Sequence, residues 1–216
     1  MARDTSTRER LLDTAQRLVI EHGFGSTTID AVLAETGASK GSFFHYFPTK
    51  AELGRALVER YAAADAALLD ELMEAAEAIS DDPARQLVAF VAGFEEATVD
   101  MVAVQPGCLF VSFIYETGVA GPATDEIVTD SILLWRHKIQ EKLEAAVARR
   151  PSPPPVDLPS LADQAFTIFE GGYLLARALG DPGALRRQVA HLRQYLALLF
   201  AVSPDVEPAR RVDAVD

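Results

Sequence analysis

A stretch near the amino end, residues 36–50 with the sequence TGASKGSFFHYFPTK, combines basic, hydroxyl and aromatic side chains. Lysine, serine, histidine and tyrosine can donate hydrogen bonds to phosphate oxygens or to base edges. The donors are Lys40, Ser42, His45, Tyr46 and Lys50. Gly41 stands among them and, having no Cβ, would let the backbone approach a groove closely. The stretch therefore has the chemistry of a surface that binds a nucleic acid.

Two short predicted helices position these donors. One begins at Thr27 or Thr28 and ends at Gly37, and the next begins after Ser39, its expected N-cap. A short helix, a turn with glycine and a second short helix make a helix-turn-helix pattern. Because free amides at helix starts favour anions, we expect the helix starts at Thr27 or Thr28 and at Thr49 to bind phosphates, and we count Thr27, Thr28 and Ser39 among the DNA-binding residues.

Three phenylalanines are expected to divide between two faces of the second short helix. Phe43 and Phe47 lie four residues apart and can anchor this helix against the first helix of the chain. Phe44 faces outward and is expected to make only apolar contact, for example with a thymine methyl group. The alternative, in which the aromatics are only core and the lysines only solvated, explains neither Gly41 inside a helix nor an exposed Tyr46.

Helical periodicity continues along almost the whole chain. The pattern Ser6-x-x-Glu9 is a capping box that opens the first helix, and Gly23 is expected to end it in a left-handed cap. A second capping box, Thr49-x-x-Glu52, opens a long helix to about residue 79. Further helices are expected over residues 83–102, 108–118, 122–150, 160–179 and 182–202.

These patterns predict an all-α protein of about nine helices. Residues 1–48 form a three-helix, helix-turn-helix domain that binds DNA, and residues 49–203 form a larger helical domain that binds a ligand and dimerises. Residues 204–216 are expected to be a disordered tail. The prolines of residues 151–159 exclude helix and favour an extended linker between two helices.

Composition and charge narrow the class of protein. Hydrophobic residues make up 49% and charged residues 24% of the 216, which is typical of a globular chain. The net charge is −12, but residues 1–50 carry six basic and six acidic residues, so the excess negative charge follows residue 50. One cysteine, no apolar segment of membrane-spanning length and no N-terminal signal pattern favour a cytoplasmic protein without a membrane partner.

The amino-terminal part of the sequence resembles the TetR family of bacterial transcriptional regulators. The resemblance is carried by LLDTAQRLVIEHGF and by TTIDAVLAETGASKGSFFHYFPTKAEL, residues 27–53, with Phe44 where the family most often has tyrosine. It covers residues 7–55, and the remainder agrees only in length and helical character. The resemblance implies a ligand cavity coupled to the DNA-binding domains and a dimer built from a four-helix interface.

The charge distribution also favours a dimer. One short helix offers few phosphate contacts and the rest of the chain is acidic, so useful affinity requires two copies on one duplex. A twofold homodimer would read a near-palindromic operator with half-sites about 34 Å apart. The last two helices carry the apolar stripes expected to form its interface, which comprises Phe166, Gly171, Gly172, Leu192, Leu196 and Leu199. The glycine pair indicates either a closely passing backbone or a local kink.

Bulky side chains in the middle of the chain are candidates for an apolar, partly aromatic effector site. They are Phe90, Phe94, Cys108, Phe113, Trp135, Phe169 and Tyr173, with Glu116, Gln164, Glu170 and Arg177 as possible polar contacts. Ordinary core packing is the alternative for each of them. For Cys108, a reactive thiol at a helix start and an inert buried cysteine are both open readings.

An enzyme and a non-DNA-binding helical protein are the two rival functions to a DNA-binding regulator. The sequence contains no H-E-x-x-H motif, phosphate-binding glycine loop, nucleophile elbow or cysteine pair, and its four histidines are scattered, so we expect no enzyme, metal or cofactor. An all-helical scaffold or small-molecule-binding protein without DNA binding is the second rival. We favour a ligand-responsive repressor that binds a palindromic operator as a homodimer and is released by a small, largely apolar effector.

Overall fold

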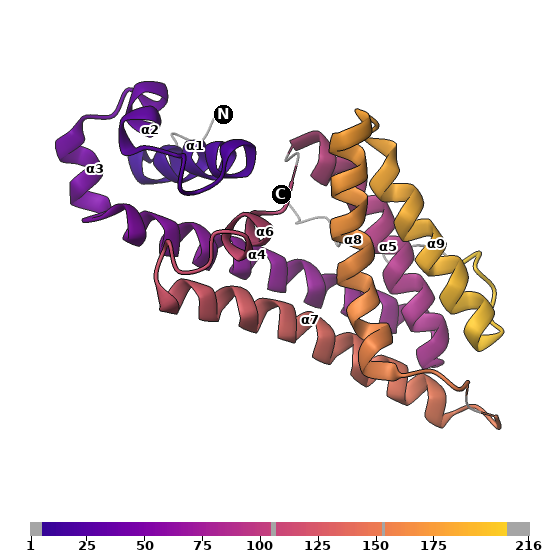
Figure 1. The fold of residues 1–216 in the computed structure, drawn as a ribbon. Helices are drawn as coiled ribbons and strands as arrows, with labels where there is room; N and C mark the ends of the chain where they lie inside the picture. The colour runs from indigo at the N-terminus through magenta and orange to yellow at the C-terminus, as the bar shows by residue number, and fades with distance from the viewer. Residues whose placement is uncertain (1–5, 105–106, 153, 207–216) are drawn as a thin grey trace. The chain divides into compact units, whose positions relative to one another are not determined.

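A computed structural model describes residues 6–104, 107–152 and 154–206 of the chain. Every regular element in this part is an α-helix, which confirms the all-α prediction (Figure 1). The described residues form nine helices: α1 Thr7–His22, α2 Ile29–Thr36, α3 Lys40–Tyr46, α4 Lys50–Ile79, α5 Pro83–Val104, α6 Leu109–Ile114, α7 Pro122–Ala148, α8 Leu158–Leu179 and α9 Gly183–Phe200.

Local sequence explains where the first four helices begin. In each, a serine or threonine hydroxyl accepts a hydrogen bond from the backbone N–H three residues later, at 3.1–3.3 Å. The capping residues are Ser6, Thr28, Ser39 and Thr49. These bonds satisfy amides that have no partner within the helix, so the predicted starts are confirmed.

The glycines after α1 and α2 end their helices differently. Gly37 is left-handed, with φ 67° and ψ 11°, as a C-cap glycine should be. The expected left-handed cap at Gly23 is wrong, because its φ of 85° is combined with an extended ψ of 157°. The chain leaves α1 extended and can therefore place the next residue, Phe24, in the core, where its side chain is buried.

The first of two compact units contains Met1–Ala64 and Gly107–Ser131. In this unit α1 packs against α2, α3 and α6. Its core is formed by Leu11, Leu12, Val19, Phe24, Phe43, Phe47, Leu57 and Phe113. The unit that holds the helix-turn-helix thus extends beyond the expected boundary at residue 48, because the start of α4 and the later α6 supply part of its core.

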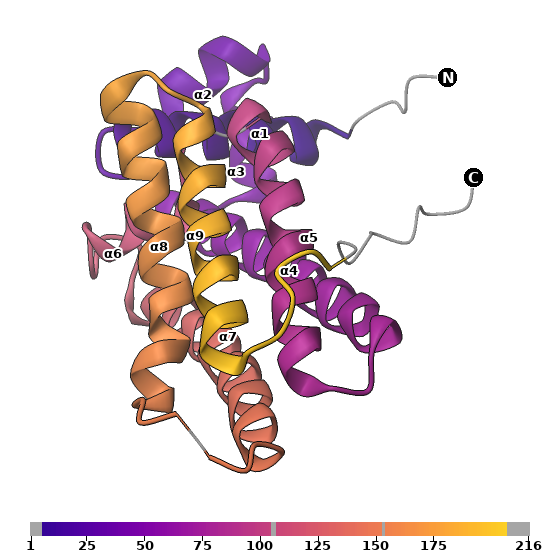
Figure 2. The same ribbon diagram turned by 90° about the vertical axis from the view of Figure 1, so that its right-hand side faces the viewer.

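The second compact unit contains Asp65–Pro106 and Ile132–Asp216. Here α9 packs between α5 and α8, and the three helices lie side by side in both ribbon views (Figures 1 and 2). The α8–α9 contact is close at Gly172, where an added Cβ would lie 2.6 Å from Leu185 Cδ1 and 2.9 Å from its Cα. Gly172 is therefore needed for packing within one chain.

The end of the chain is partly described. After α9, the carbonyl of Pro204 accepts a hydrogen bond from Arg193 Nη1 at 2.6 Å, and Val206 packs against the core of the second unit. The rest of the expected disordered tail, residues 207–216, lies outside the described residues. Across the described residues, no helix combines the length and the apolar character that a membrane crossing requires.

Candidate functional site

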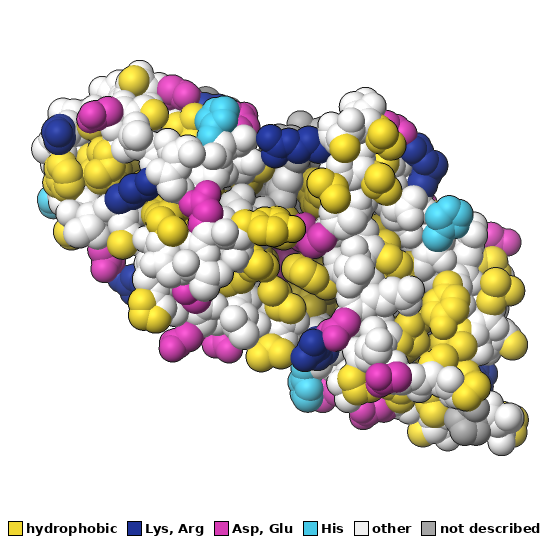
Figure 3. Space-filling model, viewed as in Figure 1, with side chains coloured by type: hydrophobic (Ala, Val, Ile, Leu, Met, Phe, Trp, Pro, Cys, Tyr) yellow, Lys and Arg dark blue, Asp and Glu magenta, His cyan; other side chains and the backbone are white. Residues whose placement is uncertain are grey.

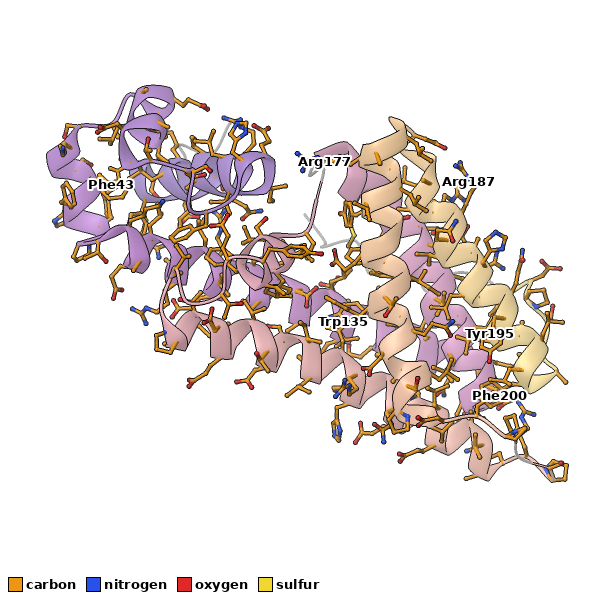
Figure 4. The ribbon with its side chains drawn as sticks, viewed as in Figure 1. Phe43, Trp135, Arg177, Arg187, Tyr195 and Phe200 are labelled. Atoms are coloured by element: carbon orange, nitrogen blue, oxygen red, sulfur yellow. The ribbon has the colours of Figure 1, made fainter. Side chains whose placement is uncertain are left out.

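The short helix α3 has one buried and one exposed face. Phe43 and Phe47 are 0% and 2% exposed, whereas Phe44 and Tyr46 are 40% and 39% exposed. Figure 4 shows Phe43 on α3, and its ring centroid lies 5.8 Å from that of Phe47. Core packing thus fixes α3 from behind, as its sequence predicts, and its other face is open.

The exposed face of α3 brings together most of the predicted donors. Lys40, Gly41, His45 and Tyr46 are exposed, and Ser42 is half-buried. The His45 and Tyr46 rings meet edge to face at 5.0 Å, so each limits the motion of the other. In the space-filling view, basic and apolar side chains lie next to one another over α3 (Figure 3). A cation, an imidazole and a phenol on one open helical face can bind phosphates and base edges.

The two threonines before α2 play different roles. Thr28 is exposed and caps α2 by accepting from the Ala31 N–H. Thr27 is only 4% exposed, and its hydroxyl donates to the Gly23 carbonyl at 2.8 Å. The Thr27 side chain therefore closes the α1–α2 loop from inside, and of the two threonines it is Thr28 that lies exposed at the helix start.

Lys50, which was expected to bind a phosphate, is held against the α1–α2 loop. Its Nζ donates to the Gly25 carbonyl at 2.9 Å and lies 4.7 Å from the centre of the Phe24 ring. Burial lowers the pKa of Lys50, and the nearby Glu116 carboxylate opposes that shift. The ammonium group therefore stabilises the loop in this structure.

Five of the predicted effector-site residues form a continuous chain of aromatic rings in the second unit. The contacts run from Phe90 to Trp135, Phe94, Phe169 and Tyr173, with centroid distances of 6.1, 5.5, 5.1 and 4.9 Å. Trp135, labelled in Figure 4, connects α7 to α5 in this chain. Such a cluster can pack against a flat apolar molecule.

Asp65 is a polar member of this cluster that sequence reasoning missed. Its Oδ2 accepts a hydrogen bond of 2.6 Å from Trp135 Nε1. Burial raises the pKa of Asp65 to about 6, although the bond from Trp135 acts in the opposite direction. A signal was present in the sequence, because Asp65 falls on the same helical stripe of α4 as Leu68 and Leu72.

Comparisons with known protein families agree with this arrangement. Residues 11–57 match the family model described as bacterial regulatory proteins, tetR family. Residues 83–192, about half of the chain, match the tetracyclin repressor-like C-terminal domain. The chain belongs to the TetR family.

Individual relatives and solved structures show how far this likeness extends. The chain is 39% identical over 71 residues to the HTH-type transcriptional repressor NemR of Escherichia coli, which is 33% of this chain and 36% of NemR. It is 35% identical over 83 residues to the repressor AcnR of Corynebacterium glutamicum, which is 38% of this chain and 44% of AcnR. The chain thus spans less than half the length of these curated relatives.

Solved structures match over nearly the whole fold. A TetR transcriptional regulator from Chloroflexus aurantiacus aligns with a TM-score of 0.70 and 27% identity, over 88% of this chain and 94% of that one. A TetR-family regulator from Agrobacterium tumefaciens aligns with a TM-score of 0.72 and 22% identity, over 88% and 96%. The second likeness shows the fold alone.

Two predicted effector-site residues of this TetR-family chain do not join the aromatic cluster. Cys108 and Phe113 belong to the first compact unit, whereas the five clustered residues belong to the second. Phe113 packs on Phe24 with centroids 5.0 Å apart, and the buried Cys108 accepts a 3.9 Å hydrogen bond from the Tyr61 hydroxyl. Both side chains therefore pack in the core of the first unit.

Three of the six predicted dimer residues are buried within their own chain. Leu192 and Leu196 are buried in the core of their own chain, as is Gly172 against Leu185. Phe166, Gly171 and Leu199 are half-buried. The apolar side chains that do face outward from α8 and α9 are Leu174, Leu175, Leu179, Tyr195 and Leu198. We call these five the α8–α9 outer face; Figure 3 shows apolar side chains gathered over these helices.

Proposed function

We propose that this TetR-family chain is a regulator that binds double-stranded DNA through α2 and α3. The observation that carries the proposal is the division of α3, in which Phe43 and Phe47 are buried while Lys40, His45 and Tyr46 are exposed. Core packing explains the buried phenylalanines of α3, but it does not explain an exposed lysine and an exposed tyrosine on the same short helix.

Each exposed group of α3 has a distinct proposed role. Lys40 and Ser42 reach base edges, and His45 and Tyr46 bind phosphates. Gly41 allows close approach of the helix, and Phe44 contacts a thymine methyl group. Thr28 and Ser39 contribute through the helix starts that they cap. Lys50 contributes positive charge near the same surface while it holds the α1–α2 loop.

We further propose that two copies bind a palindromic operator, with the α8–α9 outer face as the dimer interface. Leu198 is 82% exposed and Leu174 and Leu179 are each 69% exposed, which is costly for leucine in water unless another surface covers it. Two copies place two α3 helices on one duplex, which compensates for the small number of phosphate contacts in each.

The aromatic cluster of the second unit supports a small, largely apolar effector. Phe94, Trp135 and Phe169 are half-buried, so part of each ring is accessible. We propose that an aromatic or planar molecule binds there and releases a repressor from its operator. This would place sensing and DNA reading in different compact units of the chain.

The test is the double variant Lys40→Ala, Tyr46→Ala. We expect its affinity for an operator duplex, selected from a random library by the wild-type protein, to fall about a hundred-fold, because a base contact and a phosphate contact are lost. Fluorescence anisotropy over a salt series measures this.

The matched control is Lys138→Ala, Leu133→Ala, which removes a lysine and a large side chain from exposed or partly exposed positions on α7, outside α3. It should bind within about two-fold of wild type. Equal affinities for the α3 variant and wild type, with helical content unchanged, would contradict the assignment of α3 as the reading helix.

A further inference from the structure

The α1–α2 loop, residues 23–28, is held from both sides by residues far away in the sequence. On one side, the Glu116 carboxylate accepts a hydrogen bond from the backbone N–H of Gly25. On the other, Lys50 Nζ donates to the Gly25 carbonyl at 2.9 Å. Charged side chains thus bind both backbone polar groups of Gly25, and such hydrogen bonds are stronger than those between neutral partners.

The loop sequence GFG is what allows the carboxylate to approach. A Cβ on Gly25 would lie 3.0 Å from Glu116 Oε2, and a Cβ on Gly23 would collide with Glu116 Oε1. Gly23 also has a φ of 85°, which other residues rarely adopt. The two glycines therefore leave a space that the Glu116 carboxylate fills.

The residue between these glycines fixes the loop in the core. Phe24 is 1% exposed, and its ring lies 5.0 Å from that of Phe113 in α6. Gly54 in α4 makes room for it, since a Cβ there would lie 2.6 Å from Phe24 Cζ. The loop is thus attached to α4 and to the region of α6 by one apolar contact and two charged ones.

The position of this loop determines where α2 begins. The Thr27 hydroxyl bonds back to the Gly23 carbonyl, and the next residue, Thr28, caps α2. Moving Gly25 would therefore move the start of the helix-turn-helix. Contacts of α1 with α2 and α3, and the ion pair from Arg17 to Glu35, hold the other end of α2.

We propose that Glu116 is a positioning residue for DNA binding, which acts by holding the α1–α2 loop and through it the reading helix α3. The proposal rests on the proposed function. Glu116 was expected to contact an effector, but its carboxylate lies on the loop. Residues 115–121 join α6 to α7, most of which belongs to the second unit, so a shift of this segment would withdraw the carboxylate and loosen the helix-turn-helix.

The experiment compares Glu116→Ala, Glu116→Gln and Glu126→Ala in the full-length protein. Glu126→Ala is the matched control, because it removes one exposed carboxylate of the same unit from α7, outside residues 115–121. Affinities are measured by anisotropy for the duplex that the wild type selects from a random library and for a scrambled duplex of equal length. Hydrogen exchange of residues 23–28 is measured without DNA.

We expect Glu116→Ala to bind the selected duplex about ten-fold more weakly, because loss of a charge-assisted bond lowers the fraction of chains with α2 and α3 in place. Its affinity for the scrambled duplex should change less than about two-fold, since charge attraction without register needs no fixed helix. Glu116→Gln retains an oxygen that accepts from Gly25, so it should stay within about three-fold of wild type. Exchange at Gly25 should accelerate in Glu116→Ala and not in the control.

Equal selected-duplex affinities for Glu116→Ala and Glu126→Ala would overturn the proposal, and so would unchanged exchange at Gly25. If the wild type itself binds no duplex in a salt-dependent manner, the proposed function fails. In that case the exchange of Gly25 still decides whether Glu116 holds the loop.

Discussion

The exposed face of α3 and the α8–α9 outer face both place large side chains in water, but with different neighbours. On α3, the exposed Phe44 and Tyr46 lie beside Lys40 and His45. On α8 and α9, four of the five exposed large apolar side chains are leucines, and Leu174 and Leu175 are adjacent in sequence. The first set mixes apolar groups with a lysine and a histidine, and the second consists of four leucines and one tyrosine.

This difference indicates which partner each surface fits. A DNA groove presents phosphates and base edges, which need donors and positive charge. The α8–α9 outer face consists of four leucines and Tyr195, so it offers one hydroxyl and no charge of its own, and it fits another apolar protein surface such as its own copy. The excess negative charge follows residue 50 and would repel DNA. The DNA-binding face of α3 lies before this acidic part of the sequence, and the α8–α9 outer face lies within it.

The largest expected effect tests whether the α8–α9 outer face is the dimer interface. We expect Leu174→Glu, Leu198→Glu to raise the dimer dissociation constant about a thousand-fold, because unpaired carboxylates would be buried in an apolar interface. Sedimentation velocity across a concentration series measures it. Leu133→Glu, on an exposed part of α7, is the control and should leave the dimer intact. A doubly substituted protein that remains dimeric would place the interface elsewhere.

The next effect separates the two faces of the α8–α9 pair. In the Leu174→Glu, Leu198→Glu background, adding Leu196→Ala should lower the free energy of unfolding by about 3 kcal/mol, because Leu196 is in the core of its own chain. Adding Leu179→Ala, which is exposed, should change it by less than about 0.5 kcal/mol. Urea unfolding followed by circular dichroism measures both, and similar values for the two would contradict the assigned orientation of these helices.

The smallest expected effect concerns the partly buried charged groups Lys50 and Asp65, which lie in different compact units. In the first unit, Lys50 has Glu116 nearby, whereas Asp65 in the second unit has a hydrogen bond from Trp135 and a pKa raised by burial to about 6. The carboxyl group of Asp65 therefore binds its proton more tightly in the folded protein than in the unfolded chain. The stability that the proton contributes is present below the ordinary pKa of 3.8 and is lost as pH rises through about 6.

Asp65→Asn should consequently stabilise the protein by about 2 kcal/mol at pH 8, because an amide oxygen still accepts from Trp135 without a buried charge. The gain should disappear as the pH falls below about 4. Urea midpoints for both proteins from pH 4 to pH 8 measure this difference. A gain that is the same at every pH would show that burial of the Asp65 charge is not its cause.

Local features of the fold could be predicted from the sequence because they depend on neighbours in the chain. Ser6, Thr28 and Ser39 cap the residues three positions later, and this geometry needs no information from elsewhere. Phe43 and Phe47 share a face because four residues make about one helical turn. Exposed positions of α3 then follow as the opposite side of the same helix.

Errors arose where two segments compete for the same apolar side chain. The spacing of Leu192 and Leu196 predicts an interface stripe, but both side chains are buried in the core of their own chain, where α9 packs against α5 and α8. Thr27 looks available in the sequence and is inside the first unit, whereas the expectation of a buried Cys108 is confirmed. The contact of Glu116 with Gly25 could not be predicted, because the two residues are 91 positions apart in the sequence. The glycines at positions 23 and 25 do not indicate which side chain approaches them.

The order of residues along the chain determined the helices, their caps and the composition of the reading face, since these follow from spacing within a few turns. Tertiary packing decided which apolar stripe is left uncovered, how the aromatic residues group and which charged side chains hold the α1–α2 loop. A stripe pattern states that one face of a helix will be buried, but not by which partner, and only the three-dimensional arrangement supplies that partner.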